Sequence, residues 1–509
     1  MKPLGFINNK ENKNSQILKF SNLRIIFALG LSVCLLFSAC KESVTNPETV
    51  QEIPEIFPDY TGVTIPASIA PLNFTVGGDF EKINLSIQGG KEGHLEIQSS
   101  DYIDIPEAQW KQLLTANTGG EIQFTVSVKS NGQWKQYAPF PVYISPHPID
   151  YGLAYRLIAP GYEVYSKMGI YQRNLSNFKQ SAILENTIVP GSCMNCHSFN
   201  QTKPEKMSLH IRGTHGGTII QTGNSYKILD TKTEETIGSC VYPYWHPSEK
   251  FIAYSVNKTQ QTFHAAKEEL IEVLDLASDV VVYDLETNEL LTCNLLQTEN
   301  FETFPVFSPD GKTLYFCCAG NQTLPDDYRK IRYNLCSIAF DPDTKTFGSK
   351  IDTLILADVQ EKSVSFPKPS FDGKYLMYTL LNYGNFGIWH SEADLYILNL
   401  SDGSTRELTE VNSADADSYH NWSSNSHWFV FGSRRIDGLY TRPYIAAIDE
   451  NGKIGKPFPV PQKHPDNYLN SLFSYNVPEF ISGPVELDAN RAEKMINSSE
   501  REKVSYKNQ

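Results

Sequence analysis

The chain has 509 residues and a formal net charge of −14, from 44 Lys and Arg against 58 Asp and Glu. This length predicts two or three domains, and 40% hydrophobic residues with 12% aromatics exclude disorder over most of the chain. The negative charge argues against a nucleic-acid-binding protein, and nine cysteines are too few for a disulfide scaffold.

Residues 1–39 are expected to be a signal peptide. Its first 24 residues contain five basic residues and one acidic residue, and a 13-residue apolar run follows at 25–37. That run is shorter than the roughly 20 residues of a membrane-spanning helix. Ser38-Ala39-Cys40 resembles the lipobox of bacterial lipoproteins, which implies export and a lipid on Cys40 as the membrane anchor. An ordinary signal peptide cleaved nearby is the alternative. Lys41, in place of the Asp of inner-membrane retention signals, favours the outer membrane.

Two segments are predicted before the main domain. Residues 40–55, rich in Glu, Ser, Thr and Pro, predict a flexible tether. Residues 56–147 alternate apolar and polar residues between Gly and Asn turns, which predicts a small Ig-like β-sandwich. A Pro-rich piece at 139–148 marks the boundary with the next domain.

The most explicit chemical motif is Cys193-Met194-Asn195-Cys196-His197. C-x-x-C-H is the attachment motif of c-type haem, in which two thiols bind the porphyrin and the histidine binds iron. The motif therefore predicts a covalent haem c. A redox or disulfide CxxC pair and half of a zinc site are the two alternatives.

A low-spin haem iron needs a sixth ligand, and two nearby residues are candidates. Met207 and His210 both follow the motif, but in an extended strand they point to opposite faces, so only one can reach the iron. Met207 is preferred. Arg212 is a candidate partner for a haem propionate.

Residues 148–488 are predicted to form a β-propeller. Four cassettes, each a strand, a turn and an aromatic strand, begin at Tyr242, Phe304, Phe366 and Tyr419. The equivalent residues Phe307, Phe371 and Trp422 are 64 and 51 residues apart, which predicts propeller blades, six or seven in number. Segments at 151–181 and 471–487 are expected to close the ring. The Cys193 motif is expected to sit in the first blade, and residues 489–509 are expected to be a polar tail.

The cassettes also resemble a known family. Phe307-Ser308-Pro309-Asp310-Gly311-Lys312 followed by an aromatic strand is similar to the PD40, or WD40-like, repeat of TolB-type β-propellers. The resemblance implies an all-β propeller at the cell envelope. It implies no activity, because propellers host enzymes, binding proteins and scaffolds.

Three functions follow as hypotheses. The first is a lipid-anchored c-type cytochrome-like propeller for electron transfer or redox sensing, with an unknown redox partner and no catalysis. The second is a TolB-like binding scaffold with a Cys193–Cys196 disulfide. The third is a hydrolase or lyase of acidic glycans that uses His246, His390 and His420, the candidate ligand-binding rim being His246, His390, Arg434 and Arg442.

Overall fold

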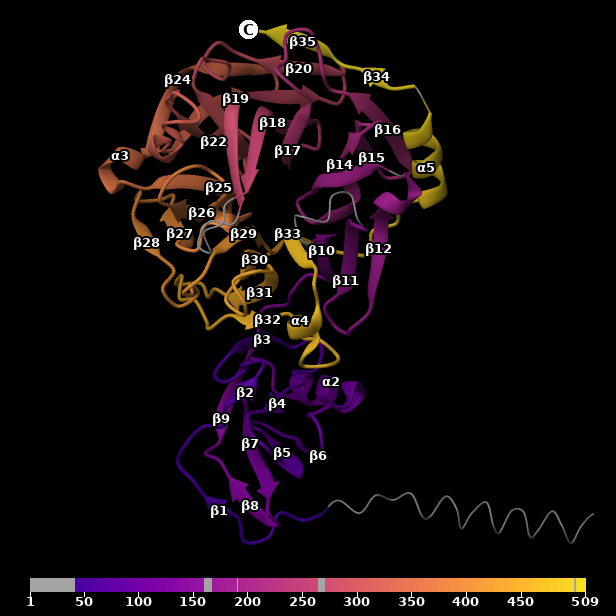
Figure 1. Ribbon diagram of the computed structural model, residues 1–509, viewed down its shortest axis with the longest axis vertical. Helices are drawn as coiled ribbons and strands as arrows, with labels where there is room; N and C mark the ends of the chain where they lie inside the picture. Colours follow the sequence, from indigo (N-terminus) through magenta and orange to yellow (C-terminus); the bar gives the residue numbers. More distant parts are fainter. Residues whose placement is uncertain (1–41, 160–166, 190, 264–270, 499) are drawn as a thin grey trace, which may run out of the picture.

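The computed structural model describes residues 42–159, 167–189, 191–263, 271–498 and 500–509. An N-terminal domain lies below a ring of β-sheets whose strands radiate from a common centre (Figure 1). The protein is all-β with a β-propeller arrangement, as the sequence predicted. The predicted signal peptide, including Cys40, lies outside the described residues.

The N-terminal domain contains one seven-stranded sheet, a separate two-stranded ladder and a helix. The sheet runs in the order β1-β8-β7-β5-β6, with β9 paired to β7 and β3 paired to β9. Its members are β1 (Glu48–Thr49), β3 (Thr64–Pro66), β5 (Lys82–Gly89), β6 (His94–Ser99), β7 (Glu121–Ser130), β8 (Gln133–Gln136) and β9 (Phe140–Ser145), and the ladder joins β2 (Ile56–Phe57) to β4 (Thr75–Val76).

This domain differs from the predicted sandwich of two sheets. The helix α2 (Glu107–Ala116) buries Trp110, Leu113 and Leu114 in the same hydrophobic core as the sheet. The predicted tether is also corrected in part, because residues 42–55 contact the domain: Glu42 forms ion pairs with Lys82 and Lys129, and β1 pairs with β8.

The ring consists of five sheets. Four of them stand as separate blades, and the fifth has nine strands. The first separate blade is formed by β33 (Ser474–Ile481), β10 (Gly152–Ile158), β11 (Gly169–Asn174) and β12 (Gln180–Glu185), and the second by β13 (Ser192–Asn200), β14 (Lys203–Gly213), β15 (Gly217–Thr222), β16 (Ser225–Asp230) and β34 (Glu502–Lys503). The third is formed by β25 (Ser363–Pro369), β26 (Tyr375–Leu381), β27 (Asp394–Asn399) and β28 (Thr405–Glu407). The fourth is formed by β29 (Asp417–Trp422), β30 (Trp428–Ser433), β31 (Arg442–Ala447) and β32 (Phe458–Pro459).

The nine-stranded sheet contains two consecutive meanders. They are β17 (Cys240–Trp245), β18 (Phe251–Phe263), β19 (Ile271–Asp284) and β20 (Glu289–Thr292), with β35 (Ser505–Asn508), and β21 (Phe301–Phe307), β22 (Thr313–Ala319), β23 (Asn334–Asp341) and β24 (Thr346–Ile355). A single parallel pair, Ser278 with Phe301, joins them. The prediction of six or seven blades is corrected, because the described residues form four blades that are separate sheets.

The innermost strands close the ring through the C-terminal part of the chain. The strands β33, β13, β17, β21, β25 and β29 contact one another in this cyclic order. The strand β33 pairs with β10, so a late segment completes the earliest sheet of the ring, as expected. The Cys193 motif therefore lies on the innermost strand of the second sheet, and it is part of that strand rather than an insertion into the first blade.

The cassette turns hold their strands through a repeated side-chain bridge. The Ser308 hydroxyl donates to Asp310 at 2.5 Å and accepts from the N–H of Thr313 at 3.0 Å. Ser370 makes the same two bonds, with Asp372 and with Tyr375. Gly311 and Gly373 have φ of +73° and +72°, the left-handed region that favours glycine.

The predicted polar tail is corrected, because residues 489–509 add structure to the ring. The helix α5 (Ala489–Asn497) buries Ala492 and Ile496 against the second sheet. The strands β34 and β35 then extend two sheets by parallel pairing with β16 and β20. No helix in the described parts of the chain is long and apolar enough to cross a membrane.

The two domains share a continuous hydrophobic core. Trp428, Ile445 and Phe458 of the sheet β29–β32 belong to the same cluster as the N-terminal Phe124 and Trp110. The indole N–H of Trp428 also donates to the carbonyl of Pro148, in the connection between the domains, at 3.0 Å.

Ring closure can be tested with two truncations. A chain ending at Asp488 loses α5, β34 and β35. Its free energy of unfolding should fall by roughly 3 kcal/mol, mainly because the Ile496 side chain is no longer buried in its hydrophobic cluster. A chain ending at Phe473 also loses β33 and should show no cooperative thermal transition by circular dichroism. An unchanged melting midpoint for that shorter chain would contradict closure through β33.

Candidate functional site

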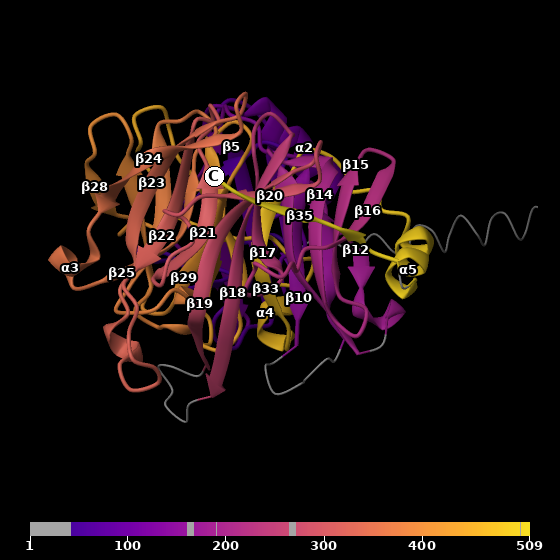
Figure 2. The ribbon, with the colours of Figure 1, turned by 90° about the horizontal axis from the view of Figure 1, so that it is seen from above.

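A large cavity lies at the centre of the ring, where the innermost strands converge. Its volume is about 710 Å³, within the range of roughly 300–1,000 Å³ that is typical of small-molecule and cofactor sites. The hairpin β18–β19 contributes Gln261, Phe263 and Val273 to the wall. In Figure 2 these two strands extend past the neighbouring blades at one side of the ring.

Each innermost strand has a β-bulge, and a residue in the left-handed conformation at that bulge points into the cavity. The pairing register shifts at this place in each of the six strands. The residues concerned, with φ between 43° and 54°, are Cys196, Tyr242, Phe304, Phe366, Tyr419 and Val477. This conformation costs a non-glycine residue roughly 1–2 kcal/mol. Such strain is concentrated at functional sites, and bulges re-aim side chains.

Four of these residues form an aromatic arc along the cavity wall. Ring centroids are 4.6 Å apart for Tyr242 and Phe304, 5.6 Å for Phe304 and Phe366, and 5.2 Å for Phe366 and Tyr419. Such an arc suits a large, flat, apolar ligand.

The bulge at Cys196 brings the two motif thiols to the same side. Cys193 and Cys196 are three residues apart, so in an unbroken strand they would face opposite sides of the sheet. The register shift between Asn195 and His197 removes this alternation, and both cysteines line the cavity. Both are free thiols, so the structure contains no Cys193–Cys196 disulfide.

His197 lies beside the thiols on the same wall and is 3% exposed. Burial, together with the nearby Arg156, lowers the pKa of its imidazole to about 3, so the ring is neutral. Its Nε2 has no hydrogen-bond partner among the described residues. A buried, neutral imidazole with an unpartnered nitrogen can serve as a metal ligand.

Two arginines add positive charge to this wall. Arg156 and Arg212 line the cavity, and Arg156 donates to the Asn195 side chain. Burial raises the pKa of the Cys196 thiol, and both guanidinium groups oppose this rise. Arginines so placed can pair with the carboxylates of a ligand.

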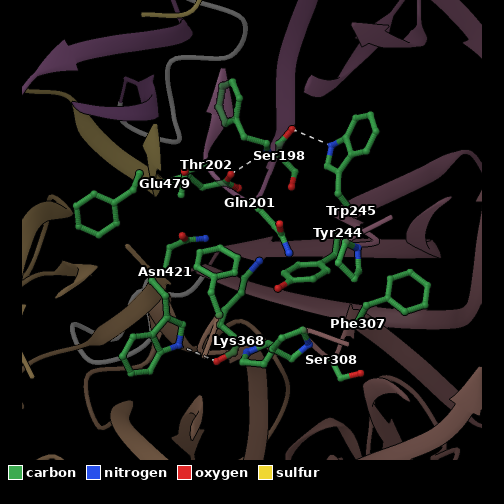
Figure 3. Close-up of a pocket in the computed structure, with 17 residues that line it drawn as sticks. Ser198, Gln201, Thr202, Tyr244, Trp245, Phe307, Ser308, Lys368, Asn421 and Glu479 are labelled. Carbon is green, nitrogen blue, oxygen red and sulfur yellow. Dashed lines mark hydrogen bonds between the residues drawn. The ribbon is translucent and has the colours of Figure 1, made fainter. Parts of the chain in front are cut away.

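Lys368 and Glu479 lie where the cavity meets a narrow second pocket of about 30 Å³ (Figure 3). The Lys368 ammonium is 4.8 Å from the Tyr244 ring centroid, and Glu479 accepts the Phe199 N–H at 3.0 Å. Burial raises the pKa of Glu479 to about 7, with Lys368 opposing the rise, and burial lowers the pKa of Lys368.

The expected sixth ligands do not line the cavity. Met207 is fully buried in a hydrophobic cluster with Met194 and Ile211. His210 is buried too, and its Nδ1 is 3.0 Å from the Thr218 hydroxyl. Because both residues lie within the sheet rather than on the cavity wall, their placement gives no support to the predicted coordination by Met207 or His210.

The predicted ligand-binding rim is corrected, because its four members are buried and none lines the cavity. The Nε2 of His246 lies 2.9 Å from the Gly311 carbonyl. His390 lies between Glu272 and Glu392, which raise its pKa to about 9 although burial, the largest influence, opposes them.

The two rim arginines have structural positions. The Arg434 guanidinium stacks 4.0 Å from the Trp389 ring centroid. Arg442 donates to the carbonyls of Tyr468 and Ser471, both at 2.7 Å, and so holds the segment before β33. Neither guanidinium points into the cavity.

The proposed histidine cluster is not formed. In the described part of the chain, the one group of three metal-ligating side chains involves other residues, and His246, His390 and His420 are not among them. The hydrolase or lyase hypothesis therefore loses the residues on which it relied.

Sequence reasoning missed several residues that line the cavity. The aromatic arc had a signal, since its members are the first residues of the four repeated cassettes. Lys368 and Glu479 had none, because they are 111 positions apart and meet only through ring closure.

Comparisons with known proteins show no close relative. No protein-family model and no curated protein matches the chain. Among solved structures, it is similar to an ancestral GH74 enzyme (13% identity, TM-score 0.34, 62% of this chain and 39% of that chain), a Mycobacterium tuberculosis puromycin-hydrolyzing peptidase (10%, 0.32, 82% and 57%) and the Dos1 propeller (13%, 0.34, 54% and 62%). The chain spans less than two thirds of each, and likenesses this weak carry no argument about activity.

The raised pKa of Glu479 predicts a pH dependence of stability. Its pKa of about 7 in the folded chain exceeds the ordinary 4.5, so the folded state holds the proton more tightly than the unfolded state. This contribution to stability is fully present below about pH 4.5 and is lost as the pH rises through 7. As the pH rises from about 5 to 8, the free energy of unfolding of the wild type should fall. In Glu479→Gln it should fall by roughly 1–3 kcal/mol less.

Urea denaturation at several pH values measures this difference. Glu249→Gln is the matched control, because Lys203 and Lys206 lower the pKa of Glu249 instead. Equal pH profiles for wild type and Glu479→Gln would contradict the assignment.

Proposed function

We propose that the central cavity holds a haem attached through Cys193 and Cys196, and that the protein serves in electron transfer or redox sensing. The observation that carries the proposal is the bulge at Cys196. It places both thiols and His197 on the wall of one cavity with the volume of a cofactor site. A strand that alternated regularly would separate the two thiols.

The residues present fit such a group. Each thiol would add across one vinyl group, with a carbon–sulfur bond formed and the thiol hydrogen transferred to the neighbouring carbon. His197, neutral and with Nε2 unpartnered, offers the iron a nitrogen ligand. Arg156 and Arg212 are suited to the propionates. When bound, the haem would supply one-electron chemistry.

The aromatic arc gives the cavity a flat apolar surface beside these ligands. Phe304 and Phe366 are two of its rings, and their contact supports the enclosure of a planar macrocycle. An apolar, enclosed surrounding also tunes the potential of a bound haem.

The repeated serine–aspartate turns support kinship with TolB-type propellers. Ser308 and Ser370 make equivalent turns in consecutive cassettes, which is the pattern on which that resemblance rests. This kinship concerns architecture and adds no activity.

Haem attachment can be tested by expressing the chain together with a cytochrome c maturation system. Wild type should gain the mass of one haem, give a haem c pyridine haemochrome spectrum and keep haem staining after SDS electrophoresis. Cys193→Ala and Cys196→Ala should each lose one thioether, which weakens or abolishes staining. His197→Ala should change the visible spectrum of haem that is still attached.

Cys293→Ala is the control for these variants. Cys293 is buried in a hydrophobic cluster and does not line the cavity, so staining should persist. A wild-type mass two hydrogens lower, without haem, would contradict the proposal and favour the disulfide scaffold.

We propose that a lipid on Cys40 anchors the protein to the outer membrane, where it meets its redox partner. Cys40→Ala should move the protein from the membrane to the soluble fraction and abolish incorporation of labelled palmitate. Cys34→Ala, in the apolar run of the same segment, is the control and should change neither result. Unchanged labelling of Cys40→Ala would contradict the anchor.

A further inference from the structure

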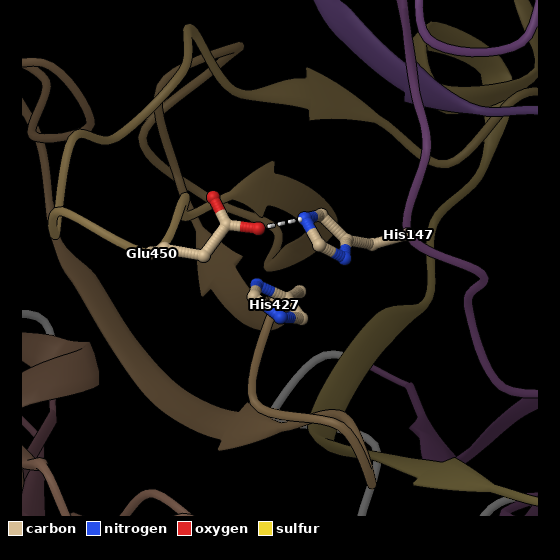
Figure 4. Close-up of side chains that lie close together, drawn as sticks. All are labelled: His147, His427 and Glu450. Carbon is tan, nitrogen blue, oxygen red and sulfur yellow. Dashed lines mark ion pairs between the residues drawn. The ribbon is translucent and has the colours of Figure 1, made fainter.

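Three side chains from separate segments meet where the two domains are connected. His147 lies between β9 and β10, His427 directly precedes β30, and Glu450 lies in the turn after β31. Figure 4 shows the three side chains converging on one point. Their potential ligand atoms all lie within 4.8 Å of one another.

The geometry points to a zinc site formed by His147, His427 and Glu450, which we propose ties the N-terminal domain to the propeller. This proposal is independent of the haem.

Hydrogen bonds orient both imidazoles. The Nδ1 of His427 lies 3.1 Å from the Ile448 carbonyl, which can only accept, so Nδ1 carries the proton and Nε2 keeps its lone pair for a metal. The Nε2 of His147 is 2.8 Å from a carboxylate oxygen of Glu450. The two rings stack with centroids 3.5 Å apart and planes 13° from parallel, so the His147 ring must turn before one ion can lie in the plane of both imidazoles.

The surrounding backbone fixes these segments in place. The Pro148 carbonyl accepts from Asn425 at 2.7 Å and from the Trp428 indole at 3.0 Å. Asp150 accepts two further bonds from Ser424, at 2.6 and 2.8 Å. The connection between the domains is therefore held against the β29–β30 turn that carries His427.

The donor set and its spacing suit zinc. Two imidazoles and one carboxylate are a common Zn²⁺ ligand set, with bonds of about 2.0–2.2 Å and a fourth position for water. Tetrahedral bonds of this length require about 3.3 Å between ligand atoms. Glu450, whose side chain is 63% exposed, can shift together with the turned His147 ring.

Metal binding should stabilise the junction of the domains. An ion that binds only the folded chain raises its stability in proportion to the logarithm of metal concentration. His147 lies in the connection and the other two ligands in the propeller, so this gain should appear as protection of residues 146–150 from proteolysis.

Isothermal titration of the EDTA-treated full chain with ZnCl₂ tests the site. Wild type should bind one Zn²⁺, and Co²⁺ in its place should give the visible bands of a tetrahedral ion. His427→Gln should lose this binding, and Glu450→Gln should weaken it at least tenfold. Zn²⁺ should raise the melting temperature of wild type and leave that of His427→Gln unchanged.

Two control variants separate this site from other metal ligands. His94→Gln removes an exposed histidine that pairs with Glu96 but has no second histidine beside it, so binding should be unchanged. Cys193→Ser/Cys196→Ser removes the motif thiols and should also leave the Zn²⁺ bound.

The outcomes that would overturn the site are equally specific. They are absence of binding to wild type, equal binding by wild type and Glu450→Gln, or loss of binding with the cysteine pair. Glu450 is exposed on a turn, so its variant decides the result even if His427→Gln fails to fold.

Discussion

The structure depends on a repeated break in strand pairing at the centre of the ring. Each innermost strand has a bulge that faces the cavity, and one residue at that bulge takes a left-handed conformation. The cost, roughly 1–2 kcal/mol per residue, is offset by the packing of the surrounding strands. The result is a central cavity lined by side chains that a regular strand would direct into the sheets, including Cys196 and Phe366.

The same break connects the fold to its proposed chemistry. A CxxCH motif usually presents its cysteines from a helix, whereas here the bulge at Cys196 performs this task within a strand. His197 is neutral because it is buried, and it shares the cavity wall with the two arginines. Under the proposed function, local backbone geometry rather than a separate cytochrome domain would bring the two thiols of the motif to the cofactor.

Much of the fold could be predicted because its signals lie within short segments of the sequence. The cassettes beginning at Tyr242, Phe304 and Phe366 contain their own turn chemistry, and their repetition indicates a propeller. The N-terminal domain was less predictable, because the same alternation suits a two-sheet sandwich and a single sheet covered by α2. The last 21 residues were wrongly taken for a tail, since parallel pairing of β35 with β20 leaves no local pattern.

The sequence by itself determined the strands, their turns and the position of the CxxCH motif, because each of these depends on neighbouring residues. Tertiary structure decided which side chains share the cavity. It separated His246, His390 and His420, and it placed Met207 in a hydrophobic core. It also brought Lys368 to Glu479, and His147 to His427 and Glu450. These groupings span 111 and 303 positions and exist only because the late strand β33 closes the ring and the N-terminal domain packs beneath it.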